Sequence, residues 1–502
     1  MSRLRQYLSQ TPEDKQEAAT IAYLASLEVI SRSKPLVAES ILNELRDQRN
    51  NLKLIASENF SSLAVQLAMG NLLTDKYSEG YVNHRFYSGC GNVDVVEGEA
   101  TNLAKKVFGA DHAYVQPHSG ADANLVAFWS ILVQRVQNRE VESLGKLKLD
   151  ELSDEEYEKV RQLMMSQKVM GLSLSSGGHL THGYRHNVSS KMMQAVCYDV
   201  DRKSGLIDYT ALAEQVKREK PDILIGGYSA YPRRINFATM KEIADSVGAV
   251  FMVDMAHFAG LVAGKVFQGD YDPVPFADIV TSTTHKTLRG PRGGLILCKK
   301  EYGDTIDKGC PLVLGGPLPH VMAAKAIALD EASRPEFQEY AGRIVNNAQA
   351  LAEHVQKEGG KILTGGTDNH LIVLDVRSFG LTGRQAEAAL REAGCTSNRN
   401  TVPFDPNGPW YTSGVRLGTP AISTLGMGKE EMAEVASVIV DVLKNTKPTI
   451  VAKTGAPSKA KFETNEEVLS HAKARVSDLL GRFPLYPELE LENQVYSSAK
   501  VQ

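Results

Sequence analysis

The 502-residue chain has only five cysteines, and no two of them have the spacing of a CxxC pair. This scarcity argues against a disulfide framework or a zinc knuckle and favours a reducing compartment, so we expect a cytoplasmic protein. Basic residues number 56 against 60 acidic ones, which gives a net charge of -4. There is thus no excess of basic charge with which to bind nucleic acid or anionic membranes. No apolar run reaches the roughly 18 residues of a membrane span. The apolar stretch Ala18–Ile30 lacks the basic leader and cleavage site of a signal peptide, so it predicts an amphipathic helix.

The rest of the composition is ordinary for a large folded protein, with 42% hydrophobic and 23% charged residues. At roughly 100–200 residues per domain, the length predicts two to four domains or one large α/β unit with an appendage. Between about residues 113 and 299, short apolar runs alternate with helical patterns such as Met240–Val247. The predicted strands are Lys168–Leu174, Asp222–Gly226, Val250–Asp254, Ile279–Thr283 and Gly294–Cys298. This alternation predicts a mostly parallel sheet covered on both faces, with ligands bound beyond the carboxyl ends of its strands.

The chain divides where its composition changes. Prolines and glycines gather in Pro311–Pro319, and a long helical pattern follows over about His320–Glu358. Near the end, Lys444–Lys461 is lysine-rich and predicts a linker, after which a helical pattern leads into Arg482–Leu489. We therefore expect an N-terminal helical arm, a large domain and a small C-terminal domain, with boundaries at 1–75, 76–330 and 331–502.

A strongly charged segment, Arg139–Gln167, interrupts the strand–helix rhythm and is interpreted as an insertion. Ser153 followed by Glu156 forms a capping box for a helix that extends to about Met165. A solvated surface excursion is the simpler interpretation of this segment, and a surface that binds a partner is the alternative.

The strongest chemical signal is a lysine placed at the end of a buried strand. Lys286 follows the predicted strand end at Thr283, in a turn rich in hydroxyl groups and glycine. A desolvated lysine has a lowered pKa and is the side chain that forms Schiff bases. Asp254 closes another apolar strand 32 residues earlier, about one crossover unit away. It is either a helix cap or the partner of a protonated pyridine nitrogen.

A third element precedes the apolar helix Leu125–Val136, where the chain reads QPHSGADAN. Ser119, Gly120 and Ala121 would present backbone amides and one hydroxyl at a helix N-terminus, which suits a phosphate. An amine, a pyridinium partner and a phosphate site are together the requirements of pyridoxal 5'-phosphate.

The chain resembles the serine hydroxymethyltransferase family of fold-type I pyridoxal-phosphate enzymes. It resembles the bacterial members of this family and adds the insertion at about residues 139–167. The resemblance runs in order from about Asn51 to Gly426. The matching segments are LIASENF (Leu54–Phe60), KYSEGY (Lys76–Tyr81), GGHLTHG (Gly177–Gly183), VDMAHFAGL (Val253–Leu261), THKTLRGPRGG (Thr284–Gly294), GGTDNHL (Gly365–Leu371) and TSGVRLGTPA (Thr412–Ala421). It implies an aspartate-aminotransferase-like α/β fold, with a mostly parallel sheet and a smaller C-terminal α/β domain. It also implies a homodimer with shared active sites. The N-terminal arm is expected to contribute to the dimer interface.

The resemblance assigns the cofactor site. Lys286 matches the lysine of the Schiff base, Asp254 the partner of the pyridine nitrogen, and His179 the imidazole stacked on the ring. The remaining implied cofactor contacts are Ser119, Gly120, Ser229, His257, His285, Tyr77 and Gly316. The implied catalytic set is Lys286, Glu79, Asp254, His257, Thr283 and Tyr87. The spacing of His179 and His182 could indicate a metal pair, but no carboxylate or third histidine is found to complete it, so no metal is predicted.

The resemblance also assigns substrate and folate contacts. Arg416 matches the arginine that binds the amino-acid carboxylate, because a guanidinium offers a planar two-point fork. Ser57 and Arg292 are expected to assist it. Tyr77, Glu79 and Tyr87 match residues that reach in from the partner subunit, with Glu79 as the proton carrier. The implied folate contacts are Leu174, Gly178 and Asn400.

Three segments depart from the family pattern. Phe86 precedes Tyr87 where two tyrosines are usual, and Ala121-Asp122 replaces serine or threonine followed by glutamine. Pro311–Pro317 is less glycine-rich than its counterpart. Because Phe86 lacks a hydroxyl beside substrate and folate, we expect folate-dependent serine cleavage that is weak for the family. Folate-independent aldol cleavage and slow alanine racemisation would then form a larger share of the activity.

The sequence thus predicts reversible conversion of L-serine to glycine, with one carbon passed to tetrahydrofolate. Two alternatives stay open at this point. One is a folate-independent aldolase or racemase, and the other is a non-catalytic binding protein, against which the intact lysine and aspartate argue.

Overall fold

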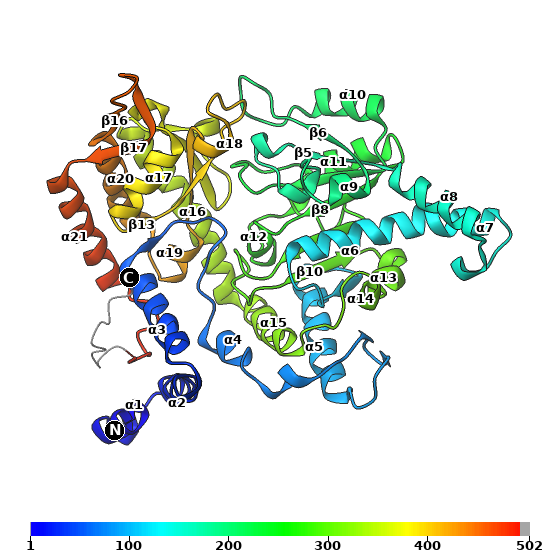
Figure 1. Cartoon of the computed structure of the whole chain (residues 1–502), viewed down its shortest axis with the longest axis horizontal. Helices are drawn as coiled ribbons and strands as arrows, with labels where there is room; N and C mark the ends of the chain where they lie inside the picture. Colours follow the sequence, from blue (N-terminus) through cyan, green and yellow to red (C-terminus); the bar gives the residue numbers. More distant parts are fainter. Residues whose placement is uncertain (1, 492–502) are drawn as a thin grey trace.

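The computed structural model, described here over residues 2–491, places two β-sheets side by side (Figure 1). The larger has seven strands in the order β4-β10-β9-β8-β7-β5-β6, and the smaller has four in the order β11-β12-β15-β14. A third group of elements, the N-terminal helices, lies below the small sheet in Figure 1, next to the end of the described chain.

The seven-stranded sheet carries all five strands predicted from the sequence. Its members are β4 (His112–Tyr114), β5 (Lys168–Leu172), β6 (Gln194–Tyr198), β7 (Ile223–Gly227), β8 (Val250–Asp254), β9 (Ile279–Thr283) and β10 (Gly294–Cys298). Strands β6, β5, β7, β8 and β9 run parallel, and β10 is antiparallel to both β9 and β4. The prediction of a mostly parallel sheet is confirmed. Strands β4 and β6 were not predicted, because β4 is only three residues long and β6 is a half-buried edge strand.

Alternate residues of the central strands enter two different cores. In β8, Phe251 and Val253 belong to one apolar cluster, whereas Val250 and Met252 belong to the other. The first cluster is completed by α5 (Gly91–Phe108), α10 (Tyr209–Glu219), α11 (Phe237–Asp245) and α12 (Ala259–Ala263), and the second by α6 (Gly120–Leu132) and α13 (Lys300–Asp307). Burial on both faces explains why these strands are continuous apolar runs.

The long helical pattern predicted over His320–Glu358 is two helices, α15 (Pro319–Ala332) and α16 (Pro335–Lys357). Proline cannot donate a backbone hydrogen bond, so Pro335 stands at the start of the second helix and the first ends before it. The predicted domain boundary at residue 330 falls within the last turn of α15.

The small sheet comprises β11 (Lys361–Ile362), β12 (Leu371–Asp375), β14 (Asn398–Asn400) and β15 (Gly414–Gly418), all antiparallel. Its core is closed by α16, α17 (Gly383–Glu392), α20 (Lys429–Lys444) and α21 (Glu466–Arg482). The middle residue of β15 is Arg416, which this strand positions at the edge of the small sheet's unit that faces the large sheet.

The prediction of a lysine-rich linker over Lys444–Lys461 is wrong. This segment contains β16 (Thr446–Ile450) and most of β17 (Pro457–Thr464), which pair as an antiparallel hairpin. Along β17 the lysines alternate with half-buried Ala460 and Phe462, so the charges occupy only the exposed face. The side chain of Gln385 donates hydrogen bonds to the carbonyls of Ser458 and Lys461, which fixes the hairpin against α17.

The N-terminal arm consists of α1 (Arg3–Gln10), α2 (Ala18–Ser33) and α3 (Pro35–Asn50), followed by β1 (Leu52–Lys53) and α4 (Leu63–Ala68). Helix α2 contains the amphipathic helix predicted from Ala18. The arm shares a small apolar cluster with Leu489 and Leu491, and Arg49 donates to backbone carbonyls near them. Strand β1 pairs in parallel with β13 (Cys395–Thr396) as a separate two-stranded sheet, and the backbone N–H of Gly418, the last residue of β15, donates to the Leu54 carbonyl just after β1.

The predicted insertion projects from the large sheet's unit at the right of Figure 1 as α7 (Asn138–Ser143) and α8 (Asp154–Met165). Its capping box is confirmed: the Glu156 backbone N–H donates to Ser153 Oγ at 3.3 Å, and the Ser153 N–H donates to the Glu156 carboxylate at 2.8 Å. Over residues 2–491, no helix is both long and apolar enough to cross a membrane.

Candidate functional site

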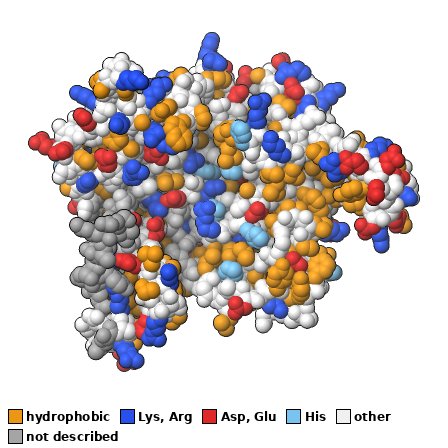
Figure 2. Space-filling view, viewed as in Figure 1, with side chains coloured by type: hydrophobic (Ala, Val, Ile, Leu, Met, Phe, Trp, Pro, Cys, Tyr) orange, Lys and Arg blue, Asp and Glu red, His pale blue; other side chains and the backbone are white. Residues whose placement is uncertain are grey.

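A cavity of about 230 Å³ opens at the carboxyl ends of β7, β8 and β9, where sequence reasoning expected chemistry. On the face shown in Figure 2, histidine and basic side chains lie along a hollow between the two halves of the molecule. Eleven of the predicted site residues line the cavity: Ser57, Ser119, Gly120, His179, Ser229, Asp254, His257, Thr283, His285, Lys286 and Arg292.

Lys286 provides the amine of this cavity. Burial lowers the pKa of the Lys286 amine to about 8, although the carboxylate of Asp254 acts in the opposite direction. The turn that carries it is held by the side chain of Asn59, which donates to the Lys286 carbonyl at 2.9 Å. A buried, well-positioned lysine with a lowered pKa is a nucleophilic amine near neutral pH.

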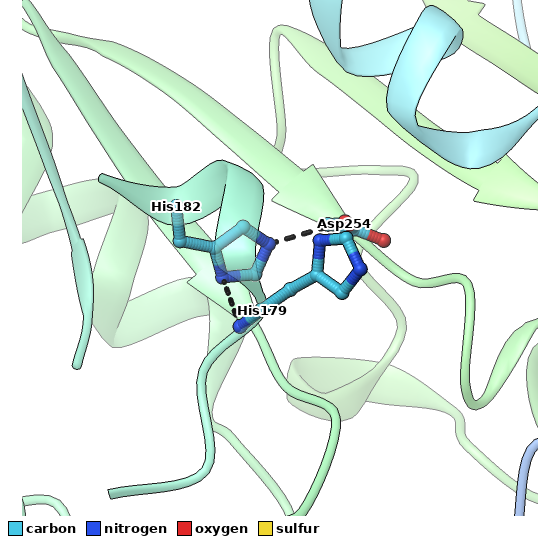
Figure 3. A group of neighbouring side chains, drawn as sticks. All are labelled: His179, His182 and Asp254. Carbon is cyan, nitrogen blue, oxygen red and sulfur yellow. Dashed lines mark hydrogen bonds and ion pairs between the residues drawn. The ribbon is translucent and has the colours of Figure 1, made fainter. Parts of the chain in front are cut away.

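Asp254 provides a buried carboxylate at the end of β8, and its neighbours keep it ionised (Figure 3). Asn124 Nδ2 donates to Asp254 Oδ2 at 2.9 Å, and His182 Nε2 lies 3.1 Å from the same oxygen. Burial alone would raise the pKa of Asp254, but the hydrogen bonds from His182 and Asn124 hold it well below its usual range. Since His182 Nδ1 accepts from the backbone N–H of His179 at 3.3 Å, Nε2 is the nitrogen that carries the proton.

The expectation that no carboxylate joins His179 and His182 is wrong. Ligand atoms of His179, His182 and Asp254 lie within 4.8 Å of one another, because the loop after β5 meets the end of β8. Spacing along the chain could not reveal this. These atoms are already engaged, since His182 bonds Asp254 and His179 Nδ1 lies 2.7 Å from the Thr181 hydroxyl.

The predicted phosphate loop caps helix α6. Ser119 Oγ accepts from the Asp122 backbone N–H at 3.2 Å and donates to the Asp122 carboxylate at 2.9 Å. Gly120 lies against the strand that leads to Lys286, because a Cβ at Gly120 would lie 2.6 Å from Thr283 Cγ2. A Cβ on Gly294 would lie 2.2 Å from the Ser119 carbonyl oxygen. Only glycine lets the loop approach the sheet this closely.

Lys325, which sequence reasoning missed, supports this loop from inside the protein. Its ammonium donates to the carbonyls of Val115 at 2.5 Å, Pro117 at 3.0 Å and Gly294 at 2.8 Å. Burial lowers the pKa of Lys325 to about 7. Nothing in its sequence context, the middle of a helix, distinguishes it from a surface lysine.

Arg416 reaches the site from the small sheet. Its Nη1 donates to the Ser229 carbonyl at 2.6 Å and its Nε to Asn398 Oδ1 at 3.0 Å, and burial lowers its pKa to about 10. Within the described part of the chain these acceptors are uncharged, so the guanidinium is suited to an incoming carboxylate. Gly418, two residues further along β15, packs tightly on the segment that carries Ser57, because a Cβ on Gly418 would lie 2.4 Å from Ala56 Cα. This contact places Ser57 next to the strand that carries Arg416.

A second group of predicted residues lies outside the cavity. Glu79 accepts from the hydroxyls of Tyr77 at 3.2 Å and Tyr87 at 3.3 Å, and its charge raises the pKa of both phenols. Gly316 packs on Tyr77, since a Cβ there would lie 3.1 Å from the ring. Within one chain, the structure does not bring this group to Lys286.

The hairpin that carries Glu79 is anchored firmly to its own chain. It consists of β2 (Gly80–Tyr81) and β3 (His84–Arg85). Arg85 forms buried ion pairs with Asp94 at 2.8 Å and Glu97 at 2.5 Å. Gln116, at the root of the phosphate loop, donates to the carbonyl of Gly80 at 2.8 Å and to Glu97 at 2.8 Å. The hairpin and the phosphate loop are therefore one rigid assembly.

The three predicted folate contacts gather beyond β5 rather than in the cavity. Leu174 and Gly178 follow that strand, and a Cβ on Gly178 would lie 1.9 Å from the Leu172 carbonyl oxygen. Asn400, from β14, lines a small separate cavity with Ser175, Ser176 and Gly177.

The site residues fit pyridoxal 5'-phosphate. Lys286 offers a nucleophilic amine, Asp254 an ionised buried carboxylate for a pyridinium nitrogen, and Ser119 and Gly120 place the N-terminus of α6 in the same cavity as a phosphate site. The fold and the site together define a fold-type I pyridoxal-phosphate enzyme.

Comparison with known proteins narrows the class to a family. The sequence model described as "Serine hydroxymethyltransferase" matches residues 30–144 and 156–439, and the gap between these two ranges lies inside the predicted insertion. The chain is 59% identical over 489 residues to the serine hydroxymethyltransferase of Treponema pallidum, covering 97% of this chain and 85% of the relative. It is 55% identical over 496 residues to that of Chlamydia trachomatis, covering 98% and 100%, and 56% identical over 474 residues to that of Salinispora tropica, covering 94% and 99%. The chain belongs to the serine hydroxymethyltransferase family.

The lowered pKa of Lys286 predicts a specific pH dependence for cofactor capture. In cofactor-free protein, the rate of pyridoxal-phosphate attachment should rise with pH to about 8 and then level off, because the uncharged amine is the nucleophile. Nα-acetyl-lysine, whose amine has a pKa of about 10.4, should keep reacting faster above that pH.

Stopped-flow absorbance measures both rates. Dividing the rate for the protein by the rate for Nα-acetyl-lysine removes the effect of the cofactor's own titration. This ratio should be constant below about pH 8 and should fall about tenfold per pH unit above it. A ratio that stays constant to pH 10 would show that the pKa of Lys286 is not lowered.

Proposed function

We propose that this chain catalyses the reaction of its family, the interconversion of L-serine and glycine with transfer of one carbon to and from tetrahydrofolate. Enzymes of the family use pyridoxal phosphate as cofactor and tetrahydrofolate as co-substrate. The chain is then a transferase of one-carbon metabolism and glycine biosynthesis, forming 5,10-methylenetetrahydrofolate. The observation that carries the proposal is the buried Lys286 amine, which shares a cavity with the ionised Asp254.

Lys286 and Asp254 act on the cofactor from different sides of this cavity. When bound, pyridoxal phosphate withdraws electrons from the substrate bond that breaks. Nζ of Lys286 would bind the cofactor's aldehyde carbon, and its lowered pKa suits this amine to taking up and releasing a proton. Asp254, which His182 and Asn124 keep ionised, would hold a proton on the pyridine nitrogen.

The other cavity residues position the cofactor and the substrate. Ser119 and Gly120 would bind the phosphate, with the Ser119 hydroxyl giving up its bond to Asp122, and Tyr77 and Gly316 of the second subunit would complete that end. His179 would hold the face of the ring, and Ser229 and His257 its phenolic oxygen. Arg416, assisted by Ser57 and Arg292, binds the substrate carboxylate. Thr283 and His285 support the turn of Lys286 from its two sides.

We further propose a homodimer in which Tyr77, Glu79 and Tyr87 complete the cavity of the second subunit. In a single chain these residues lie outside the cavity, and their surroundings expose large apolar side chains. Leu72 is 94% exposed, Phe86 70% and Leu312 64%. A second copy of the chain would cover such a surface. Glu79, held by the two tyrosine hydroxyls, then carries a proton between the substrate hydroxyl and folate.

Three finer assignments belong to the same proposal. Leu174, Gly178 and Asn400 bind folate beside the cavity, and the protein is cytoplasmic. The chain divides into the parts 1–75, 76–330 and 331–502, of which residues 1 and 492–502 lie outside those described. All five cysteines are free, which supports a reducing compartment. The insertion around 139–167 remains a surface excursion or a binding surface for a partner.

The direct test is serine-to-glycine turnover of the purified enzyme with and without tetrahydrofolate. We expect tetrahydrofolate to accelerate serine cleavage, and the variant Lys286→Ala to show no turnover under either condition. Equal rates with and without tetrahydrofolate would instead indicate a folate-independent aldolase or racemase, which the missing hydroxyl at Phe86 favours.

Shared active sites predict complementation between two inactive variants. Lys286→Ala and Glu79→Gln should each be inactive alone, but a one-to-one mixture should recover about a quarter of wild-type activity, because half the dimers are hybrids with one intact site. Activity after mixing and size by light scattering measure this outcome. A fully active monomer would refute the shared site.

Phe86 predicts how the folate-dependent rate can be improved. Phe86→Tyr adds the hydroxyl that the family usually has at this position and should raise folate-dependent serine cleavage, with the roughly 10²–10⁴-fold of a general acid–base group as the upper limit. Alanine racemisation needs no folate and should hardly change. Phe462→Tyr, which adds a hydroxyl on the distant β16–β17 hairpin, is the matched control. If both activities rise together, or if neither changes, the missing hydroxyl does not limit the folate-dependent reaction.

A further inference from the structure

His370, the histidine of the GGTDNHL segment, contacts the site but has no part in the proposed function. It precedes β12 of the small sheet and is fully buried. Its Nε2 lies 3.1 Å from Nδ1 of His257, and the two ring centroids are 5.3 Å apart. We propose that His370 is a positioning residue that fixes the tautomer of His257, so that His257 presents an Nε2–H donor to the cavity it lines.

The backbone around His370 leaves its ring little freedom. The carbonyl of His370 accepts from the Thr419 backbone N–H at 3.0 Å. The neighbouring Asn369 donates to the hydroxyl of Tyr228 at 3.0 Å and to the carbonyl of Tyr231 at 3.0 Å. The ring therefore approaches His257 from a fixed position that joins the small sheet to the end of β8.

Both imidazoles are neutral in this environment. Burial, together with the positive charges of Lys286 and Arg416, lowers the pKa of His257 well below its ordinary value and that of His370 to about 3. A neutral imidazole has one N–H and one bare nitrogen. The hydrogen bond between the rings thus has one donor and one acceptor, and the choice between them determines both tautomers.

The far nitrogen of His370 decides which ring donates. Within residues 2–491, His370 Nδ1 is buried and has no hydrogen-bond partner. If His257 donated, His370 would have to carry its proton on Nδ1, as a buried N–H without an acceptor, and such orphaned N–H groups are rare in proteins. If His370 donates from Nε2, only a bare lone pair is left unpaired. His257 Nδ1 is then the acceptor, and Nε2 of His257 carries the proton.

This arrangement makes His257 a hydrogen-bond donor toward the cavity rather than a base. A donor at this position stabilises an anionic oxygen, and the phenolic oxygen of the bound cofactor is the one that the proposed function places near His257. The inference rests on the proposed function only for the identity of that oxygen. The tautomer itself follows from the two histidines.

Neutron diffraction from crystals of the wild-type holoenzyme tests the tautomer directly. Deuterium should be found on Nε2 of His370 and on Nε2 of His257, with His257 Nδ1 bare. Deuterium on His257 Nδ1 would overturn the proposal. This result is independent of turnover, so it distinguishes failure of this inference from failure of the proposed function.

Two variants test the consequence. His370→Gln can keep an N–H toward His257 Nδ1, whereas His370→Met has similar volume and no donor. His370→Met should move part of the bound cofactor's absorbance from its visible to its near-ultraviolet band and lower kcat about 10–100-fold, as loss of a supporting hydrogen bond typically does, with the KM for serine almost unchanged. His370→Gln should restore most of both. If the spectrum and kcat of His370→Met match wild type, or if the glutamine variant rescues neither, His370 does not position His257.

Discussion

The structure depends on one electrostatic constraint, the burial of positive charge that the protein itself does not neutralise. Among residues 2–491, Asp254 is the only carboxylate lining the cavity, whereas Lys286 and Arg292 also line it and Arg416 donates to the carbonyl of Ser229 at its edge. Burial lowers the pKa of both Lys286 and Arg416, which measures how unfavourable their charges are there. A doubly charged phosphate and an amino-acid carboxylate are the anions that such a site favours, so the charge balance of the cavity lining already selects its ligands.

The single carboxylate remains ionised because the fold surrounds it with donors. Asn124 comes from α6, His182 from the loop after β5, and Asp254 itself from the end of β8. Three elements far apart in sequence must therefore meet at one point. The same convergence supports the phosphate loop, where Lys325 joins three backbone carbonyls from two segments of the chain. The fold brings these polar groups together, and their hydrogen bonds to one another then fix their positions.

Sequence reasoning located the parts of this site that strand ends determine. Lys286, Asp254 and Ser119 each follow or precede a buried apolar element, so their position at the edge of a parallel sheet could be inferred from pattern alone. Glu79, Arg416 and the folate contacts came only from family resemblance, because no local pattern marks them. Asn124, His182 and His370 lay inside recognised segments but gained meaning only from partners more than 70 residues away. The hairpin of β16 and β17 was mistaken for a linker because lysines on its exposed face hid a half-buried alternation.

Lys286 and Arg416 belong to different sheets, and under the proposed function this separation has an evolutionary consequence. Lys286, Asp254 and the phosphate loop are built by the seven-stranded sheet, whereas Arg416 and His370 are carried by the four-stranded one. Sequence drift within the smaller unit can therefore alter which amino acid is accepted while the larger unit retains the cofactor. A lineage could change its substrate preference in small steps without passing through ancestors unable to hold pyridoxal phosphate.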